Sequence, residues 1–263
     1  ETASGFTTSG ATVVPDPATL PNGILFWRAL TQWMGGLGVI VLGVAVLPLL
    51  GTGGMQLTRA ESSGLSVDRL TPKFQGTALR FWLVYVGLTA AAFAFLVVGE
   101  MGAFDAVVHA LATVSTGGFG TSASSVAAFG AYTKWVIIAF MFLGGVSFVL
   151  HFRALRDPAV YWKSAEFRIY FFLIVFAAFL VAGGLWAEMG PDTAIIEGVF
   201  ASVALITTTG FTSSDFGTWR PALQVLVVGL MFLGGMAGST AGGIKSFRIG
   251  VLVKAAYADL RRL

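Results

Sequence analysis

The sequence predicts an all-α membrane protein built from repeated units, each a helix, a re-entrant pore loop and a second helix. First, 56% of the 263 residues are hydrophobic and only 11% are charged, with a mean hydropathy of +0.83 that lies far outside the range of soluble domains. Second, the basic residues gather in three short stretches. Third, a Ser/Thr–Gly cluster occurs three times, each time ahead of a strongly apolar segment.

Five stretches approach the roughly 20 apolar residues that are needed to cross the hydrocarbon core of a bilayer. They are residues 24–50, 79–99, 132–152, 167–187 and 221–255, the last of which is interrupted. All but three of the 16 Lys and Arg residues lie between or after these segments, in 59–80, 153–168 and 245–262. We interpret these basic stretches as cytoplasmic topology signals, rather than as lipid- or nucleic-acid-binding surfaces, and expect the more acidic connections to face outside.

Several classes of site are excluded by composition. The chain contains no cysteine, which rules out disulfides and thiolate metal sites, and its two histidines, His109 and His151, are too few for a histidine-based metal site. It begins at Glu1 without an initiator methionine or a signal peptide, so we expect it to be a fragment. No Ser–His, paired-Asp or HExxH arrangement indicates an enzyme, and no nucleotide-binding loop is present.

The outer connections share an internal order: a short amphipathic stretch, a Ser/Thr–Gly cluster and a polar exit. Aligning TTSGAT (7–12), VSTGGF (114–119) and TTTGFT (207–212) places Gly10, Gly117 and Gly210 in register. A Gly-Gly pair follows these glycines after 25, 27 and 24 residues. The chain therefore contains two complete repeats, preceded by one that lacks its first helix.

The repeated unit has a physical rationale. Non-helical backbone at membrane depth survives only where it is buried in protein or lines a watery path, so a short helix such as 103–114 followed by a Thr-Gly segment implies a pore. Glycine permits a positive φ, and ringed carbonyl and hydroxyl oxygens can replace the water around an alkali cation. One such cluster alone is better explained as an ordinary turn, but three in register favour a filter.

The stretches GFTTSGATVV, ATVSTGGFGTS, LITTTGFTSSDF, LPLLGTGGMQLTRAE and AGSTAGGIKSFR closely resemble the TrkH family, the membrane subunits of bacterial Trk potassium uptake systems, within the TrkH/KtrB/HKT superfamily. The resemblance covers essentially the whole chain and implies four repeats around one pseudo-fourfold, potassium channel-like pore. It implies the following division: first-repeat pore loop and second helix 1–50, cytoplasmic linker 51–78, second repeat 79–152, linker 153–166, third repeat 167–255 and cytoplasmic tail 256–263. The first helix of the first repeat and a fourth repeat are expected outside this chain.

The resemblance also implies a function, namely potassium translocation through a selectivity filter. The implied ion-coordinating residues are Thr8, Ser9, Gly10, Ser115, Thr116, Gly117, Thr208, Thr209 and Gly210. Glycine in each visible filter favours potassium, while a sodium-permeable transporter and a structural subunit of a membrane complex remain alternatives. Further implications are symport, a homodimer, a cytosolic TrkA-type nucleotide-binding ring as partner, the bacterial inner membrane as location, and no cofactor besides the transported K⁺.

The third Gly-Gly pair leads into a segment unlike the other two. GGMAGSTAGGIK (234–245) contains glycines that each cost about 1 kcal/mol in a helix relative to alanine, so we predict a break there, whereas the corresponding helices in 24–50 and 132–152 are expected to continue. Small-residue helix packing is the alternative. The resemblance implies an intramembrane gate formed by Gly234, Gly235, Gly238, Ser239, Thr240, Gly242, Gly243 and Lys245.

Four charged or titratable residues need separate interpretation. Lys245 is either an ordinary lysine at the cytoplasmic helix end or a charge that moves with the gate. We expect His109 to make a structural hydrogen bond rather than to sense protons. Glu197 and Asp215 either concentrate cations at the pore mouth or are solvated loop charges.

Overall fold

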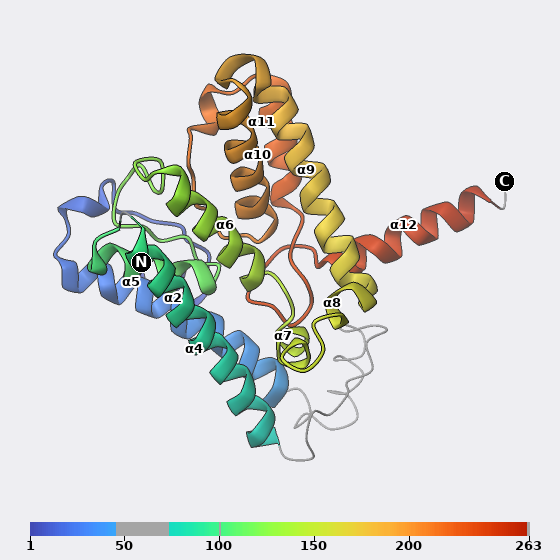
Figure 1. The fold of residues 1–263 in the computed structure, drawn as a ribbon, viewed down its shortest axis with the longest axis horizontal. Coiled ribbons are helices and arrows are strands. Elements are labelled where there is room, and N and C mark those ends of the chain that lie inside the picture. Colours follow the sequence, from blue (N-terminus) through green and yellow to red (C-terminus); the bar gives the residue numbers. More distant parts are fainter. Residues whose placement is uncertain (46–73, 100, 262–263) are drawn as a thin grey trace.

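The structure, a computed structural model, describes residues 1–45, 74–99 and 101–261 (Figure 1). Within these ranges all regular structure is helical, and the only β-type pairing is an isolated bridge between Leu233 and Ile244. The predicted all-α class is confirmed. Among the described residues, two helices are long and apolar enough to cross a membrane, α4 (Phe74–Val98) and α9 (Ala165–Met189), and they correspond to the predicted segments 79–99 and 167–187.

The predicted segment 24–50 begins as α2 (Asn22–Ala45), and its remaining residues lie outside the described part of the chain. The expected linker 51–78 also falls largely outside it. The last five residues of that linker, 74–78, already belong to α4, which packs against α2.

The predicted segment 132–152 is not one continuous helix, and this expectation is wrong. Helix α6 (Ala131–Gly144) ends at the Gly-Gly pair, and α7 (Phe148–Ala154) leaves it at an angle of 102°. Interrupting the helix here costs little free energy, because Gly144 and Gly145 have low helix propensity and because neighbouring segments bind the carbonyl groups that the break exposes.

The predicted break in 221–255 is confirmed. Helix α11 (Pro221–Met231) stops well before α12 (Ser246–Leu260), and residues 232–245 between them are not helical. Helix α12 extends away from the other helices toward the C-terminus (Figure 1) and runs past residue 256, where the tail was expected to begin.

Three shorter helices precede the Ser/Thr–Gly clusters. They are α1 (Thr2–Phe6), α5 (Ala103–Val114) and α10 (Pro191–Ile206), and α5 has the predicted bounds. Helices α5 and α10 are largely buried, while α1 buries only Gly5. Helix α5 packs against α2, α4 and α6, and α10 packs in the same way against α6, α9 and α11. Each of these two short helices, α5 and α10, is therefore enclosed by its own repeat and by the second helix of the preceding repeat. The remaining short elements are α8 (Val160–Lys163), η1 (Pro17–Thr19) and η3 (Phe216–Thr218).

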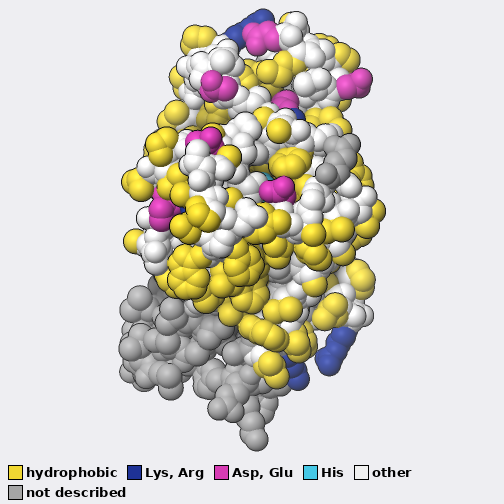
Figure 2. Space-filling model, turned by 90° about the vertical axis from the view of Figure 1, so that its left-hand side faces the viewer, with side chains coloured by type: hydrophobic (Ala, Val, Ile, Leu, Met, Phe, Trp, Pro, Cys, Tyr) yellow, Lys and Arg dark blue, Asp and Glu magenta, His cyan; other side chains and the backbone are white. Residues whose placement is uncertain are grey.

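The outer surface is apolar where the long helices are exposed. Phe179 on α9 is 74% exposed and Val225 on α11 is 73% exposed, values that suit contact with lipid tails rather than water. Figure 2 shows that the acidic side chains on one face all lie in the upper part of the view, above an apolar region. This separation fits a protein whose polar ends lie on either side of a hydrocarbon layer.

Candidate functional site: three left-handed turns and the broken segment

The short helices α1, α5 and α10 end in the same backbone turn. A hydroxyl residue caps each helix and donates its N–H to the carbonyl four residues earlier: Thr7 to Ala3, Ser115 to Leu111, and Thr207 to Val203. The next residue has a positive φ in each case: Thr8 (53°), Thr116 (52°) and Thr208 (57°). Such angles are uncommon for residues other than glycine, so their threefold recurrence marks a built feature rather than three chance turns.

A left-handed glycine follows two residues later, and it corrects the predicted register. The glycines with φ near +75° are Gly10 (70°), Gly118 (82°) and Gly210 (75°). Gly118, not Gly117, is therefore equivalent to Gly10 and Gly210, and Gly117 occupies the place of Ser9 and Thr209. The Gly-Phe pairs at 118–119 and 210–211 are the sequence signal that identifies this register. The physical requirement is for glycine where the chain turns left-handed.

Successive turns lie against one another through their backbones. A β-carbon added to Gly10 would lie 2.6 Å from the carbonyl oxygen of Gly117, and one added to Gly118 would overlap the carbonyl oxygen of Thr209. A β-carbon on Gly210 would meet nothing within 4 Å. The first turn thus packs on the second and the second on the third, with carbonyl oxygens at both contacts.

A buried glutamine makes two hydrogen bonds to the backbone of the second turn. Gln32 on α2 is fully buried, donates from Nε2 to the carbonyl of Gly117 at 2.6 Å and accepts from the N–H of Phe119 at 3.1 Å. Sequence reasoning missed this residue. An uncharged polar side chain in the apolar stretch ahead of Gly35-Gly36 was the available signal.

An acidic residue at the N-cap of α1, and one on each of α5 and α10, binds the chain as it leaves the turn. Glu1 accepts from Thr12 Oγ1 at 2.7 Å and from the N–H of Val13 at 2.8 Å, and Asp105 accepts from Thr121 Oγ1 at 2.8 Å. Glu197 accepts in the same way from Ser213 Oγ. Burial raises the pKa of Glu1, but the hydrogen bonds from Thr12, Val13 and Arg28 outweigh it and lower that pKa to about 2.

The three basic residues outside the clusters each pair with an acid on this side of the molecule. Arg28 contacts Glu1 at 2.9 Å, Lys134 contacts Glu197 at 2.9 Å, and Arg220 contacts Glu188. Both expectations for Glu197 are wrong, because its side chain is 5% exposed and bound to Lys134 and Ser213 instead of facing the mouth or water.

The other two residues near the turns behave differently from Glu197. Asp215 is exposed and accepts from the N–H of Gly217 at the start of η3. His109 is fully buried, and its Nδ1 lies 2.8 Å from the carbonyl oxygen of Asp105, as expected for a structural hydrogen bond. Its ring stacks on Phe211 at 5.7 Å, which links the second pore helix to the third turn.

The broken segment 232–245 fills the break between α6 and α7. The N–H of Met236 donates to the carbonyl of Gly145 at 2.9 Å, and the N–H of Phe148 donates to the carbonyl of Gly238 at 3.0 Å. Thr240 Oγ1 donates toward the carbonyl of Gly144 at 3.1 Å. The two non-helical stretches therefore satisfy each other's backbone groups, which is the physical reason why both helices break.

The same segment also contacts the end of α5 and the third turn. Thr240 Oγ1 lies 3.2 Å from the carbonyl oxygen of Val114, the last residue of α5, and the N–H of Gly242 donates to Thr208 Oγ1 at 2.7 Å. Gly238 and Gly243 are left-handed, with φ of 75° and 67°. The small residues serve this close backbone approach, and not the packing of a continuous helix.

Lys245 ends the broken segment and precedes α12. Its side chain turns back to donate to the carbonyl of Ala241, so its charge stays beside the segment. Two other buried side chains, Tyr85 and Tyr170, donate to the carbonyls of Trp33 and Phe142, each two residues ahead of a Gly-Gly pair, at 2.9 and 3.0 Å. These equivalent tyrosines tie each first helix to the second helix of the preceding repeat, and sequence reasoning missed them.

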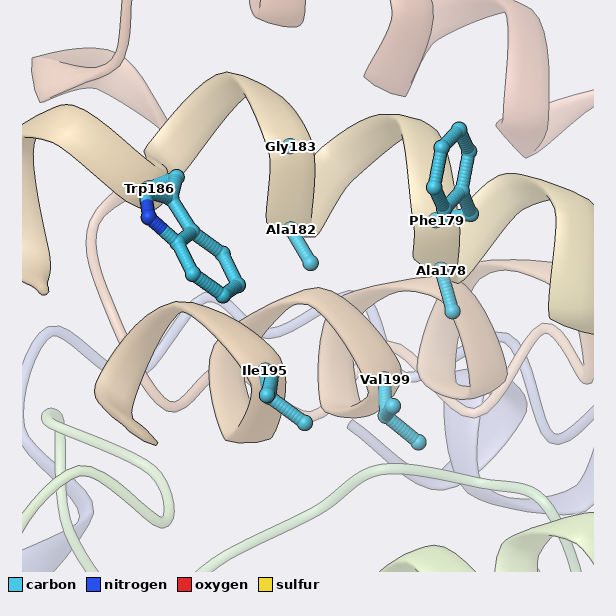
Figure 3. A pocket seen from close by; sticks show the side chains of 7 residues that line it. All are labelled: Ala178, Phe179, Ala182, Gly183, Trp186, Ile195 and Val199. Carbon is cyan, nitrogen blue, oxygen red and sulfur yellow. The ribbon is translucent and has the colours of Figure 1, made fainter. Parts of the chain in front are cut away.

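One surface pocket of the described residues is apolar. It is an apolar groove of about 250 Å³ between α9 and α10, lined by Ala178, Phe179, Ala182, Gly183, Trp186, Ile195 and Val199 (Figure 3). These side chains offer no oxygen to a cation. Among the described residues, moreover, no group of three or more His, Cys, Asp or Glu side chains could hold a metal ion.

Comparisons with known proteins agree with this architecture. The model of the TrkH family, described as a cation transport protein, matches residues 1–181 and 159–263. The chain is 42% identical to the Trk system potassium uptake protein TrkH of Escherichia coli K12, covering 100% of this chain and 56% of the relative, and 36% identical to the Trk system potassium uptake protein TrkI of Halomonas elongata, covering 100% and 54%. The crystal structure of the potassium transporter TrkH from Vibrio parahaemolyticus superimposes with a TM-score of 0.86 at 36% identity, over 98% of this chain and 54% of that one. The chain thus spans about half the length of the curated relatives it matches.

Proposed function

This chain belongs to the TrkH family of cation transport proteins, and from this premise we propose that it lines most of a potassium-selective path across the membrane. One observation carries the proposal: three pore helices end in equivalent left-handed turns whose backbones pack on one another through carbonyl oxygens. The family is one of transport proteins rather than enzymes.

The filter consists of Thr8 to Gly10, Thr116 to Gly118 and Thr208 to Gly210. Their carbonyl and hydroxyl oxygens replace the hydration shell of K⁺, and the carboxyl ends of the pore helices favour a cation through their partial negative charge. Ser115 caps α5 and donates to the carbonyl of Ala112 at 3.2 Å, so it supports the filter. A fourth turn, from outside this chain, would lie on the open side of Gly210.

The segment 234–245 is the gate. Its contacts with Val114 and Thr208 support this role, because they hold uncharged backbone against the second pore helix and the third turn. Lys245 lies beside the segment through its bond to Ala241, so its charge would move together with the gate and repel cations while the gate is closed.

The proposal includes the wider setting of the protein. The basic stretches face the cytoplasm of a bacterial inner membrane, and the pore loops enter from the periplasmic side. The full-length protein forms a homodimer, is regulated by a cytosolic TrkA-type nucleotide-binding ring and couples uptake to a second ion. The likeness to Trk system uptake proteins supports these assignments.

The test is uptake by the full-length protein that contains this segment, expressed in a strain deficient in potassium uptake. We expect growth at low potassium and a larger rubidium than sodium flux. Gly118→Ser should reduce both the growth and the preference for rubidium. Equal sodium and rubidium fluxes would indicate a poorly selective cation transporter. No uptake by a correctly inserted protein would indicate a structural subunit.

A further inference from the structure

A buried acid outside the filter and the gate contacts the broken segment and the start of the helix that follows it. Glu166 lies in the first turn of α9 and is 5% exposed. Its Oε1 accepts from the N–H of Ala237, within the segment, at 2.7 Å and lies 3.4 Å from Oγ of Ser246, the first residue of α12. One carboxyl group therefore connects the segment and the start of α12 to the end of a membrane-spanning helix.

Two positively charged features lie near the carboxyl group of Glu166. The first turn of α12 has no side-chain cap from its own N-cap residue, Lys245, and a carboxylate near a helix N-terminus interacts favourably with its free N–H groups and dipole. The Lys245 ammonium also acts on the Glu166 carboxyl group. The positive end of α12 and the Lys245 side chain at the end of the segment are thus both attracted to Glu166.

Oε1 of Glu166 accepts both of these hydrogen bonds, from the N–H of Ala237 and from Oγ of Ser246. A buried carboxyl group needs such donors, because it has lost its hydration. Replacing the Glu166 side chain therefore removes the acceptor that connects the broken segment and α12 to α9.

We propose that Glu166 is the positioning residue that latches the 232–245 segment against the second pore helix and the third turn, and that its release accompanies opening. This inference rests on the proposed function, in which that segment is the gate. Glu166 touches neither the left-handed turns nor their supporting residues Gln32 and Lys134, so the latch acts on opening and leaves ion selectivity unchanged.

The test uses the full-length protein in proteoliposomes, with Glu166→Ala, Glu166→Gln and the control Glu188→Gln. Glu188 lies at the other end of α9 and pairs with Arg220 on the surface. Two quantities are measured: the rubidium leak of the closed protein, and the labelling rate of Ala241→Cys by a polar thiol reagent. This chain contains no cysteine, so labelling is specific once any cysteines elsewhere in the protein are replaced.

Glu166→Ala is expected to raise both the leak and the labelling rate tenfold or more, which corresponds to about 1.4 kcal/mol. Glu166→Gln keeps an acceptor for the N–H of Ala237 but loses the charge, so we expect a smaller increase, and this variant carries the test if Glu166→Ala does not fold. The rubidium-to-sodium ratio and the Glu188→Gln control should match wild type.

The latch would be overturned if the rubidium leak and the labelling rate in both Glu166 variants matched those of the wild type. It would also be overturned if Glu188→Gln raised them as much as the Glu166 variants do. These outcomes differ from failure of the proposed function. If the wild-type protein conducts no rubidium, the transport proposal fails, while the labelling of Ala241→Cys still shows whether Glu166 holds the segment in place.

Discussion

Replacing Lys134 by methionine should leave the buried Glu197 carboxylate without its ion-pair partner, at the point where the chain leaves the third turn. Glu197 is 5% exposed and Lys134 is 14% exposed, and their contact at 2.9 Å connects the start of α6 with the middle of α10. After the substitution, the Glu197 carboxylate would retain its bond from Ser213 but lose its ion pair with Lys134.

The magnitude follows from the burial of this pair. Removing one member of a buried ion pair typically costs about 3–5 kcal/mol, because the remaining charge stays desolvated without compensation. In the double variant Lys134→Met/Glu197→Gln both charges are absent, while the glutamine amide can still bind Ser213. We therefore expect the double variant to recover most of the stability that Lys134→Met loses, with a coupling energy of about 2 kcal/mol or more between the two positions.

Thermal unfolding of the purified full-length protein in detergent measures the stability, and rubidium and sodium fluxes in proteoliposomes measure the filter. Lys134→Met should lower the unfolding midpoint and the rubidium preference together, since Glu197 positions the chain leaving the third turn. The exposed pair of Arg220 and Glu188 provides the matched control, because surface ion pairs contribute only about 0–1 kcal/mol.

Two results would refute this reasoning. A double variant no more stable than Lys134→Met would mean that the loss comes from packing rather than from the unpaired charge. If Glu197→Gln reduced flux only at low ionic strength and left stability intact, Glu197 would instead act as a free charge at the mouth.

Three further predictions concern the turns and the gate. Gly118→Ala should lower the rubidium-to-sodium flux ratio about 5- to 30-fold, because a left-handed alanine costs about 1–2 kcal/mol and its β-carbon would meet Thr209. The control Gly87→Ala on α4 should behave like wild type. The same flux ratio in Gly118→Ala as in wild type would contradict the revised register. Gln32→Leu leaves the N–H of Phe119 without its partner and should reduce the same ratio, and an unaltered ratio would exclude a role for Gln32 in the filter. Deleting residues 238–243 should give a constitutively open protein, as judged by rubidium leak, and a tightly closed deletion variant would rule out the gate.

The membrane class, the helical repeat and the break in the last segment could all be predicted from the sequence, for physical reasons that are local. Hydrocarbon demands long apolar helices, and the density of glycine in 234–243 makes a helix there costly whatever surrounds it. The bounds of α5 also followed from local pattern, because its amphipathic stretch ends at a Ser/Thr–Gly cluster.

The errors arose where contacts distant in sequence decide the conformation. The bend after Gly144 depends on acceptors and donors from 236–240, almost 100 residues later, and a helix propensity cannot register them. The register of the second Ser/Thr–Gly turn was misjudged by one residue, because two adjacent glycines, Gly117 and Gly118, look equivalent in sequence. Only the backbone angles, and the close approach of Gly118 to Thr209, separate them.

The sequence by itself thus determined that this is a membrane protein of repeated helix–loop–helix units with glycine-containing turns, since these features follow from hydrophobicity, spacing and local backbone freedom. The tertiary structure alone decided which buried polar groups meet: Gln32 with the second turn, Lys134 with Glu197, and Glu166 with the broken segment and the start of α12. The physical reason is that a polar group inside an apolar structure must find a partner, and which partner it finds depends on how distant helices pack.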